Sequence, residues 1–422
     1  MNNRLQICYN ILFGILSCAL WAQPPSIGGL ETKVDSIMSV AIQQKAFPGG
    51  QLLLAKEGEI VFHKAYGYHT YDSIRPTRLN DLYDLASVTK ILGPLPALMK
   101  LYEEGKIDLD QPFSKYWKPW RRKKDKADLT LREILAHQAG LRPYIVFLND
   151  VMKKGEFRQK YIRHQATKHF NQQAYDQIYV KDNFKKKIYK SISKSEVSKD
   201  KTYRYSGLAF LIFPELIQNL SGHSYEYYLQ KHFYGPVGAS SLVFKPKTKG
   251  YPNAIVPTEL DTLYRKSLVQ GWVHDENASL MGGVSGNAGL FGSARDVYNM
   301  MQLYQNYGAF NGQQILNEKT VKEFSRIQYP ENENRRGLGF DKPLINNSEL
   351  AISEAYPAPA SSPESFGHSG FTGTFVWADP KYQMVFIFLS NRVYPNRNHR
   401  NLYDLNIRTS LQQLFYEHLI RR

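Results

Sequence analysis

The chain is poor in cysteine, and this scarcity excludes several kinds of chemistry. Cys8 and Cys18 are the only cysteines among 422 residues, and both lie in the N-terminal segment. If that segment is removed, the mature chain has no thiol, which excludes disulfides, cysteine nucleophiles and cysteine-bound zinc. The sequence also contains no H-E-x-x-H motif. We therefore expect no metal site.

Familiar motifs of nucleotide binding and hydrolysis are absent as well. No G-x-S-x-G is present, which argues against the nucleophile turn of α/β-hydrolases. The glycine-rich segment 282–289 is not followed by G-K-[ST], and the chain has no G-x-G-x-x-G, so it offers no phosphate-binding loop. These absences predict an activity that needs no cofactor.

Negative charge is in deficit, since the chain has 38 Asp and Glu residues against 54 Lys and Arg residues. Its formal net charge is +16. The basic residues concentrate at 121–124 and across 153–201. No zinc-finger, RRM or similar signature accompanies them, so we expect no nucleic-acid partner and interpret them as a solvated basic surface. Such a surface also permits peripheral association with anionic envelope polymers or lipid headgroups.

Apart from residues 7–20, which are too few to span a bilayer comfortably, long apolar runs are missing. Arg4 precedes this stretch, and Leu20-Trp21-Ala22 resembles a signal-peptidase site. We predict a signal peptide over residues 1–22 and export to the periplasm or the extracellular space. The sequence Ile15-Leu16-Ser17-Cys18 leaves open a lipoprotein anchored through Cys18.

What is present places strands near both chain ends and helices between them. Strand-like runs occupy 51–55, 60–66, 373–378 and 384–389, and helical patterns occupy 27–44 and 405–420. The turns 56–59 and 379–382 join the strand-like runs into two hairpins. We therefore predict an α+β fold, an α/β/α sandwich with an antiparallel sheet built from both chain ends and flanked by the terminal helices.

The middle of the chain predicts a helix-rich lobe inserted into that sheet. Residues 23–422 then form one domain, with a sheet lobe near 27–67 and 366–422 and an inserted lobe near 68–365. Thr130-Leu131-Arg132-Glu133 and Ser293-Ala294-Arg295-Asp296 predict capping boxes that open helices in the lobe. Residues 141–202 are polar and Lys-rich, which predicts a long loop with a helix or two. We expect a monomer.

The most informative motif is Ser87-Val88-Thr89-Lys90, an S-x-x-K tetrad at the predicted start of a helix. Three residues are just under one helical turn, so Ser87 and Lys90 are expected to share a face. A neighbouring amine with a lowered pKa can take the proton that keeps a serine hydroxyl weakly nucleophilic. The tetrad therefore predicts a nucleophile beside a candidate base.

Two further motifs follow the tetrad in order. Tyr203-Arg204-Tyr205-Ser206-Gly207 precedes an apolar helical run, and Gly367-His368-Ser369-Gly370 stands before a predicted strand. With Leu135-Ala136-His137-Gln138-Ala139-Gly140, the chain resembles the serine β-lactamase and penicillin-binding-protein superfamily, in its branch of class C β-lactamases, DD-peptidases and esterases. The resemblance covers essentially the whole mature chain and implies a β-lactamase/transpeptidase-like fold.

The resemblance implies a role for four residues in an acyl-enzyme reaction. Ser87 would be the acylated nucleophile, and Lys90 would share its proton network. Tyr205, as a phenolate or through Lys90, would be the general base and would protonate the leaving group. The backbone N–H groups of Ser87 and Phe371 would form the oxyanion hole. Which of Lys90 and Tyr205 takes the proton stays open.

The third motif is implied to bind substrate, through His368, Ser369 and Gly370. The strand from Gly370 would pair with an extended substrate at the sheet edge. His368 stands where penicillin-recognising relatives often carry Lys, and, neutral or protonated, it is expected to contact a substrate carboxylate.

Three residues depart from the family pattern. Gly207 replaces the usual Asn or Asp, so a side-chain amide that would hold the substrate and Lys90 is missing. Pro94 and Pro96 follow the tetrad closely, so the helix is expected to be kinked or short. His137 and His274 are interpreted as packing and loop hydrogen-bonding residues without a catalytic role.

Taken together, the motifs predict an exported serine hydrolase that acts through an acyl-enzyme at Ser87. The expected substrates are amides or esters, preferably D-amino-acid peptides derived from peptidoglycan, with at most weak β-lactamase activity. The alternative is a catalytically silent module that binds cell-wall or glycan fragments in the same cleft.

Overall fold

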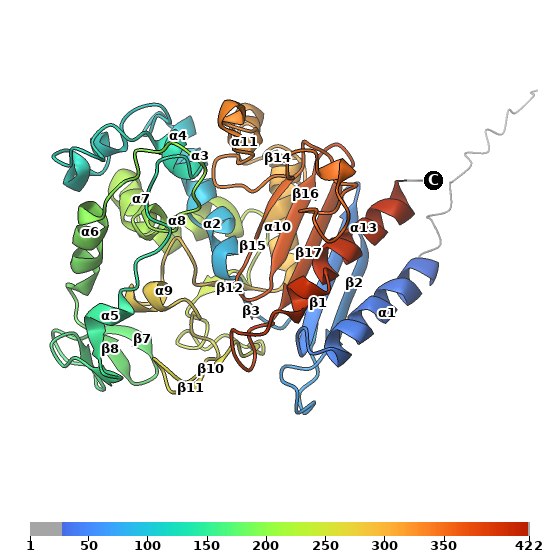
Figure 1. Ribbon diagram of the computed structural model, residues 1–422, viewed down its shortest axis with the longest axis horizontal. Coiled ribbons are helices and arrows are strands. Elements are labelled where there is room, and N and C mark those ends of the chain that lie inside the picture. The colour runs from blue at the N-terminus through green and yellow to red at the C-terminus, as the bar shows by residue number, and fades with distance from the viewer. Residues whose placement is uncertain (1–27, 421–422) are drawn as a thin grey trace, which may run out of the picture.

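The computed structural model describes residues 28–420 and centres on one five-stranded antiparallel sheet. Its strand order is β15-β16-β17-β1-β2, so the two strands from the N-terminal end lie beside the three from the C-terminal end (Figure 1). The strands are β1 Gly49–Lys56, β2 Glu59–Gly67, β15 Phe366–Ser369, β16 Phe375–Asp379 and β17 Met384–Ser390. The predicted sheet and both predicted hairpins are confirmed.

Side chains of the sheet alternate between two separate apolar clusters, as the period of two requires. Leu53, Val376 and Ile387 belong to the cluster that continues into the inserted lobe. Leu52 and Phe386 belong to a second cluster beneath α1 (Gly28–Gln43) and α13 (Ile407–Leu419), which pack against each other (Figure 1). The predicted α/β/α sandwich flanked by the terminal helices is confirmed. The predicted signal peptide and both cysteines lie outside the described residues.

The opposite face of the sheet is covered from within the inserted segment. Helix α10, Ala294–Gln305, packs on β1, β16 and β17, so the layer opposite the terminal helices comes from the middle of the chain. The other helices are α2 Thr89–Leu92, α3 Pro94–Glu103, α4 Leu131–Leu135, α5 Leu148–Val151, α6 Phe184–Lys194, α7 Phe213–Ser221, α8 Tyr225–Leu229, α9 Glu276–Leu280, α11 Glu318–Ser325 and α12 Asn401–Asp404. Among residues 28–420, none of these helices has the length and apolar character needed to cross a bilayer.

Residues 141–202 are more ordered than the predicted long loop. Besides α5 and α6 they contain a small hairpin and a three-stranded sheet. Ile162, Ile178 and Val180 are buried, but the strands are two to four residues long, too short for an alternating pattern to stand out. The short strands of the lobe are β3 Tyr83–Asp84, β4 Met152–Lys153, β5 Glu156–Phe157, β6 Ile162–Arg163, β7 Gln172–Tyr175, β8 Ile178–Val180, β9 Val243–Phe244, β10 Leu260–Asp261, β11 Ser267–Leu268, β12 Leu290–Gly292, β13 Ala309–Phe310 and β14 Gln313–Gln314.

Of the two predicted capping boxes, one is present and one is wrong. At α4, Thr130 Oγ1 accepts from the N–H of Glu133 at 3.1 Å, and the Glu133 carboxylate accepts from the N–H of Thr130 at 2.8 Å. At α10, Ser293 is the N-cap residue without a side-chain cap, because its hydroxyl contacts the Ser241 hydroxyl at 3.1 Å. The Asp296 carboxylate accepts from the N–H of Ser241 instead, so tertiary partners displace the local motif.

Candidate active site

Ser87 and Lys90 are adjacent in space, as their spacing predicts. Ser87 lies in a 3₁₀ turn, Ala86–Val88, which runs directly into α2. The Lys90 Nζ atom donates to Ser87 Oγ at 3.0 Å and to the Asn287 carbonyl at 2.9 Å. Lys90 is buried, so its amino group is held between these two acceptors, next to the nucleophile. The predicted proximity is confirmed, and the chemical roles stay a prediction.

The nucleophile turn is fastened by the buried carboxylate of Asp84. Its two oxygens accept from the N–H groups of Ala86, at 2.8 Å, and His274, at 2.7 Å. Burial raises the pKa of Asp84, although these backbone hydrogen bonds act in the opposite direction. The Thr372 hydroxyl donates to the Asp84 carbonyl at 2.8 Å. The turn that carries Ser87 is therefore tied to two other loops of the cleft.

The prolines after the tetrad interrupt the helix without moving Lys90 away from Ser87. Helix α2 ends at Leu92, Gly93 adopts φ −105° and ψ −91°, and α3 begins with Pro94. A Cβ on Gly93 would lie 2.5 Å from the Tyr225 hydroxyl, so only glycine fits this break. The predicted kink is confirmed, and it falls one turn beyond the site.

Tyr205 lies among two imidazoles and two cations. Its ring centroid is 4.6 Å from that of His137 and 6.0 Å from that of His368. Lys90 Nζ lies 5.3 Å from the same centroid, and the guanidinium carbon of Arg336 lies 5.7 Å from it. No hydrogen bond of the phenol oxygen is formed within residues 28–420, and the role of Tyr205 in proton transfer stays a prediction.

His368 is buried and neutral. Burial, and then the nearby Arg336 and Lys90 charges, lower the pKa of His368 to about 3. Its Nδ1 donates to the Ser369 carbonyl at 2.7 Å, so Nε2 carries no proton, and no described group bonds to it. The low pKa therefore argues against the protonated form of His368 as the group that contacts a substrate carboxylate. Its contact with substrate as a neutral ring stays a prediction.

The third motif forms the edge strand itself. Residues 366–369 are β15, and Gly370 opens the turn into β16, whereas the sequence predicted a strand from Gly370 onward. The outer edge is partly occupied, because Gly367 exchanges two backbone hydrogen bonds with Asp341, at 2.8 and 3.0 Å. Since alternate residues of an antiparallel strand point their polar groups outward, Ser369 is the position left for a paired substrate.

The β15–β16 turn meets the nucleophile turn closely. A Cβ on Gly370 would lie 2.7 Å from the Leu85 carbonyl, so the absence of a side chain permits this approach. The next residue, Phe371, is 48% exposed, and its ring stacks on His274 at 5.7 Å and lies under Arg392. The Phe371 N–H has no acceptor among the described residues. It is thus available for the predicted oxyanion hole.

Gly207 leaves open space beside Lys90. A Cβ placed on Gly207 would meet a single neighbour within 4 Å, the Asn287 Cβ at 3.9 Å. The Asn287 side chain accepts from the Ser285 hydroxyl at 2.8 Å and donates to Asp275 at 3.0 Å. The main-chain carbonyl of Asn287 accepts from Lys90 at 2.9 Å, so Asn287 lies between Gly207 and the catalytic lysine of the prediction.

Two residues of this cleft were not predicted from the sequence. Arg336 is buried, pairs with Asp341 at 3.0 Å and donates to the Gly339 carbonyl at 3.2 Å, yet Asn334-Arg335-Arg336-Gly337 matches no motif. Asn287 was considered only within a possible nucleotide loop. The glycines around it could have indicated a close backbone approach to another site.

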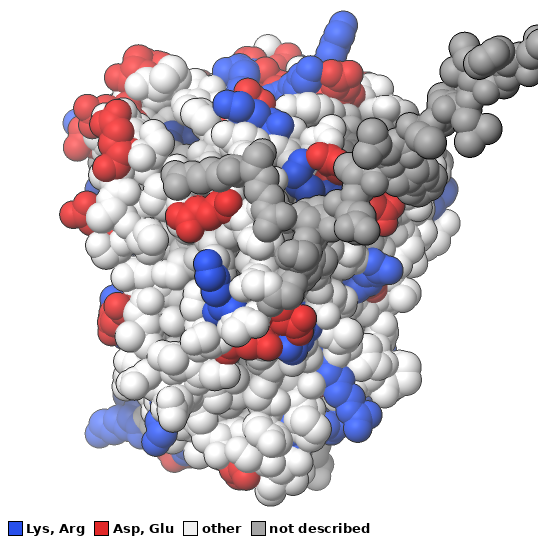
Figure 2. All heavy atoms as spheres, turned by 90° about the vertical axis from the view of Figure 1, so that its right-hand side faces the viewer, with Lys and Arg blue, Asp and Glu red and all other residues white. Residues whose placement is uncertain are grey.

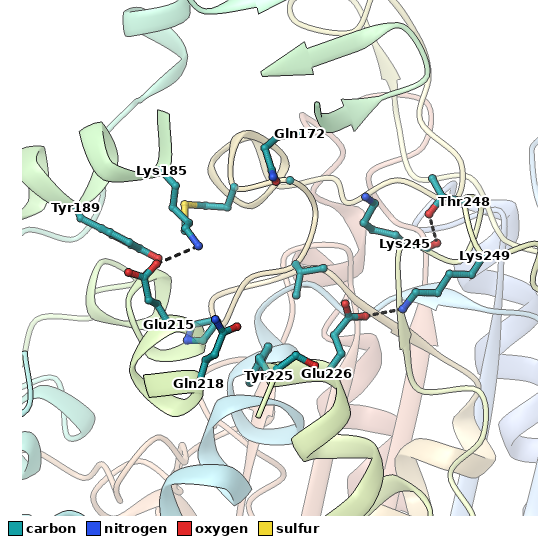
Figure 3. A pocket seen from close by; sticks show the side chains of 15 residues that line it. Gln172, Lys185, Tyr189, Glu215, Gln218, Tyr225, Glu226, Lys245, Thr248 and Lys249 are labelled. Carbon is teal, nitrogen blue, oxygen red and sulfur yellow. Dashed lines mark hydrogen bonds and ion pairs between the residues drawn. The ribbon is translucent and has the colours of Figure 1, made fainter. Parts of the chain in front are cut away.

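A cavity of about 330 Å³ opens elsewhere in the inserted lobe (Figure 3). The ion pairs Lys185–Glu215, at 3.0 Å, and Lys249–Glu226, at 2.5 Å, line it, with Gln172 and Lys245 pointing into it. It contains none of the residues predicted for catalysis. The candidate active site is therefore the cleft around Ser87 and not this cavity.

Comparisons with known proteins converge on one family. Residues 34–409 match the sequence pattern of the Beta-lactamase family. A Salmonella typhimurium protein named as a candidate D-alanyl-D-alanine carboxypeptidase is 32% identical over 373 residues, 82% of this chain and 79% of its own.

Solved structures share the fold. The hydrolase EstCE1 has a TM-score of 0.66 at 17% identity, over 91% of this chain and 98% of its own. A penicillin-binding-protein homologue from Caulobacter crescentus has a TM-score of 0.63 at 16% identity, over 92% of this chain and 97% of its own. A class C β-lactamase from Rhodobacter sphaeroides has a TM-score of 0.60 at 15% identity, over 90% and 99%.

Proposed function

We propose that this chain, a serine hydrolase that belongs to the Beta-lactamase family, forms an acyl-enzyme at Ser87 with D-amino-acid-containing cell-wall peptides or with esters. The observation that carries the proposal is the 3.0 Å contact between Lys90 Nζ and Ser87 Oγ, beside a phenol at Tyr205 whose oxygen has no partner among the described residues. A nucleophile, a buried amine and a free proton carrier in one cleft are what acyl transfer needs.

In the proposed reaction, Ser87 Oγ attacks the substrate carbonyl carbon while its proton passes to Lys90 or Tyr205. The N–H groups of Ser87 and Phe371 stabilise the negative charge on the carbonyl oxygen. Tyr205 then protonates the leaving amine or alcohol as its bond to carbon breaks. Water attacks the acyl-enzyme in the second half-reaction, and Ser87 recovers its proton.

The preference for cell-wall peptides rests on the relative's name and on the predicted export. The cleft itself favours weak β-lactam turnover, because Gly207 has no amide and His368 carries no charge toward a carboxylate. Ser369 supports the binding of an extended chain, since its outward polar groups lie beyond the Asp341 contact. We expect the protein to act outside the cytoplasm, free or anchored through Cys18.

Peripheral association with the anionic envelope is a further part of the proposal. Lys186, Lys190 and Lys194 recur every four residues along α6 and pair with no carboxylate among residues 28–420. With Lys123 they line a cavity of about 370 Å³, whose one carboxylate, Glu215, pairs with Lys185. By contrast, the face over α1 and α13 shows acidic and basic side chains interspersed (Figure 2). The unpaired lysines therefore give α6 a cationic face suited to anionic polymers.

Sedimentation with isolated cell-wall sacculi at low and high salt tests this association. Changing Lys186, Lys190 and Lys194 together to Gln should weaken binding at low salt, because the charge attraction is lost. Changing the exposed lysines Lys33, Lys45 and Lys381 to Gln is the matched control. Equal binding by both triple variants would remove α6 from the proposal.

The acyl-enzyme is tested by the intact mass of the mature protein after exposure to a fluorophosphonate, with Ser87→Ala alongside. A single adduct on the wild type that is absent from the variant is the expected result. D-peptides, esters and penicillins are then compared as substrates. A folded wild type that forms no adduct and turns over none of them would favour the alternative, a silent module that binds wall or glycan fragments.

A further inference from the structure

His137 holds the backbone on both sides of Tyr205. The N–H of Arg204 donates to the His137 carbonyl at 2.9 Å, and the N–H of Ser206 donates to His137 Nδ1 at 3.2 Å. These two bonds enclose the single residue between them. Tyr205 is therefore attached, before and after its own Cα, to one residue that lies far from it in sequence.

The His137 side chain also contacts the phenol ring that it brackets. The two ring centroids are 4.6 Å apart and the planes are tilted by 45°, a closer approach than that of His368 on the same ring. His137 is buried, so the contact excludes water from this face of Tyr205. The imidazole thus limits both the backbone path and the ring orientation of the tyrosine.

Holding His137 in this position has a conformational cost. Its φ of +55° lies in the left-handed region, which costs free energy for a residue with a side chain, although histidine adopts it more often than most such residues. Its Nε2 is buried without a partner among the described residues. Strained, underbonded residues in folded proteins concentrate where the geometry serves function. A residue that served only to fill space would not need to keep the positive φ or the unpaired Nε2.

The protonation state of His137 suits a permanent acceptor. Because Nδ1 accepts from the N–H of Ser206, the neutral ring carries its proton on Nε2. Burial, followed by the charges of Arg336 and Lys90, holds the pKa of His137 well below its usual range. The bond to Ser206 therefore persists at every pH at which the protein is expected to work.

We propose that His137 is a positioning residue for Tyr205, directing its phenol oxygen toward Ser87 and Lys90. The proposal rests on the proposed function, in which Tyr205 carries the proton. His137 does not itself contact the substrate. Its contribution should therefore disappear when the phenol oxygen is removed.

Two substitutions separate the parts of this contact. His137→Ala removes the ring and the Nδ1 acceptor. His137→Asn keeps a side-chain acceptor for Ser206 and tolerates a positive φ. With a p-nitrophenyl ester, His137→Ala should lower the acylation rate about 30-fold with little change in KM, and His137→Asn should recover part of that loss. Circular dichroism and thermal melting establish that each variant is folded.

The decisive measurement is a double-mutant cycle with Tyr205→Phe. If His137 acts through the phenol oxygen, His137→Ala should slow acylation in the protein that keeps Tyr205 and change it less than about twofold in the Tyr205→Phe background. If His137→Ala does not fold, the cycle is run with His137→Asn, whose smaller loss should vanish in the same way.

The outcomes distinguish this proposal from the proposed function. Equal losses in both backgrounds, or no loss in either, would overturn the positioning role while the wild type still forms the Ser87 adduct. An inert, folded wild type would overturn the proposed function and the positioning role with it. Loss only in the protein that keeps Tyr205, with partial rescue by His137→Asn, is the expected result.

Discussion

The two sides of the candidate active site differ in how many of their polar groups already have hydrogen-bond partners within the protein. On the nucleophile side, Asp84 accepts two backbone hydrogen bonds and Lys90 donates two. On the β15 side, the Phe371 N–H and the Nε2 of His368 have no partner among the described residues. The groups that would carry out acylation are therefore already hydrogen-bonded in place. The groups that would recognise a substrate gain hydrogen-bond partners only when a substrate binds.

This difference indicates which properties the chain shares with its family and which it does not. A nucleophile turn whose polar groups are already hydrogen-bonded supports acyl transfer to many carbonyl compounds, because it requires no contacts with parts of the substrate away from the carbonyl. The amide expected at Gly207 is missing near Lys90 and Asn287, and the β15 side presents a neutral imidazole at His368. Specificity for carboxylate-bearing β-lactams should therefore be weak even where acylation is efficient. The following changes test each side in turn.

The largest effect should come from changing Lys90, on the nucleophile side of the site. Lys90→Met removes the amine that contacts Ser87 Oγ at 3.0 Å and should slow fluorophosphonate labelling by about 10³-fold. Lys245→Met is the matched control, because Lys245 is a half-buried lysine in the cavity of Figure 3, away from the cleft. Equal labelling of the two variants would show that Lys90 does not activate the serine.

Asp84→Asn should have the next largest effect, because an asparagine oxygen cannot replace both carboxylate oxygens. One of the N–H groups of Ala86 and His274 then loses its acceptor, which costs about 1–3 kcal/mol for a buried donor. We expect a lower melting temperature and labelling slowed by about tenfold through a less well held Ser87 turn. Normal labelling by a destabilised variant would limit Asp84 to a structural role.

Substrate recognition is tested by restoring the side-chain amide that Gly207 lacks. Gly207→Asn fits the space, since a Cβ there meets only Asn287 at 3.9 Å. The added amide should raise the rate of acylation by benzylpenicillin about tenfold, the value of one good hydrogen bond. Gly207→Ala fills the same space without an amide and should give no gain. A similar rate for the two variants would mean that recognition is limited elsewhere.

The predictable parts of the molecule are those governed by local periodicity. The strand-like run over 51–55 predicted β1, and the three-residue spacing from Ser87 to Lys90 predicted an amine beside a hydroxyl. Both follow from geometry that any helix or strand must obey. The short strands within 141–202 were missed because two to four residues are too few to display a period.

The unpredicted parts of the site are tertiary. The Asn287 carbonyl reaches Lys90 across 197 residues of sequence, and a main-chain carbonyl has no residue-specific pattern to detect. Arg336 reaches the Tyr205 ring from a segment without motifs. His137, with its left-handed backbone, accepts hydrogen bonds from Arg204 and Ser206, two residues that lie far from it in sequence. Such features are visible only once the segments are placed together.

The last prediction concerns the pH dependence of stability that comes from His368 on the β15 side. Burial lowers the pKa of His368 to about 3, whereas an unfolded histidine titrates near pH 6.5. Below about pH 6.5 His368 binds a proton in the unfolded chain but not in the folded chain. The free energy of unfolding therefore has its full value above this pH and falls on acidification toward pH 3.

A group buried in this way changes the unfolding free energy by about 1 kcal/mol per pH unit within that window. His137 and His63, whose pKa values are also lowered by burial, add slopes of the same sign. Urea unfolding of the wild type and of His368→Gln between pH 4 and 7 measures how much His368 contributes to the pH dependence of the unfolding free energy. The variant should show the shallower slope of unfolding free energy against pH. His223→Gln, at an exposed site, should retain the wild-type slope. A His368→Gln slope equal to that of the wild type would mean that the imidazole charges freely in the folded protein. The β15 side would then offer a cation to a substrate carboxylate after all.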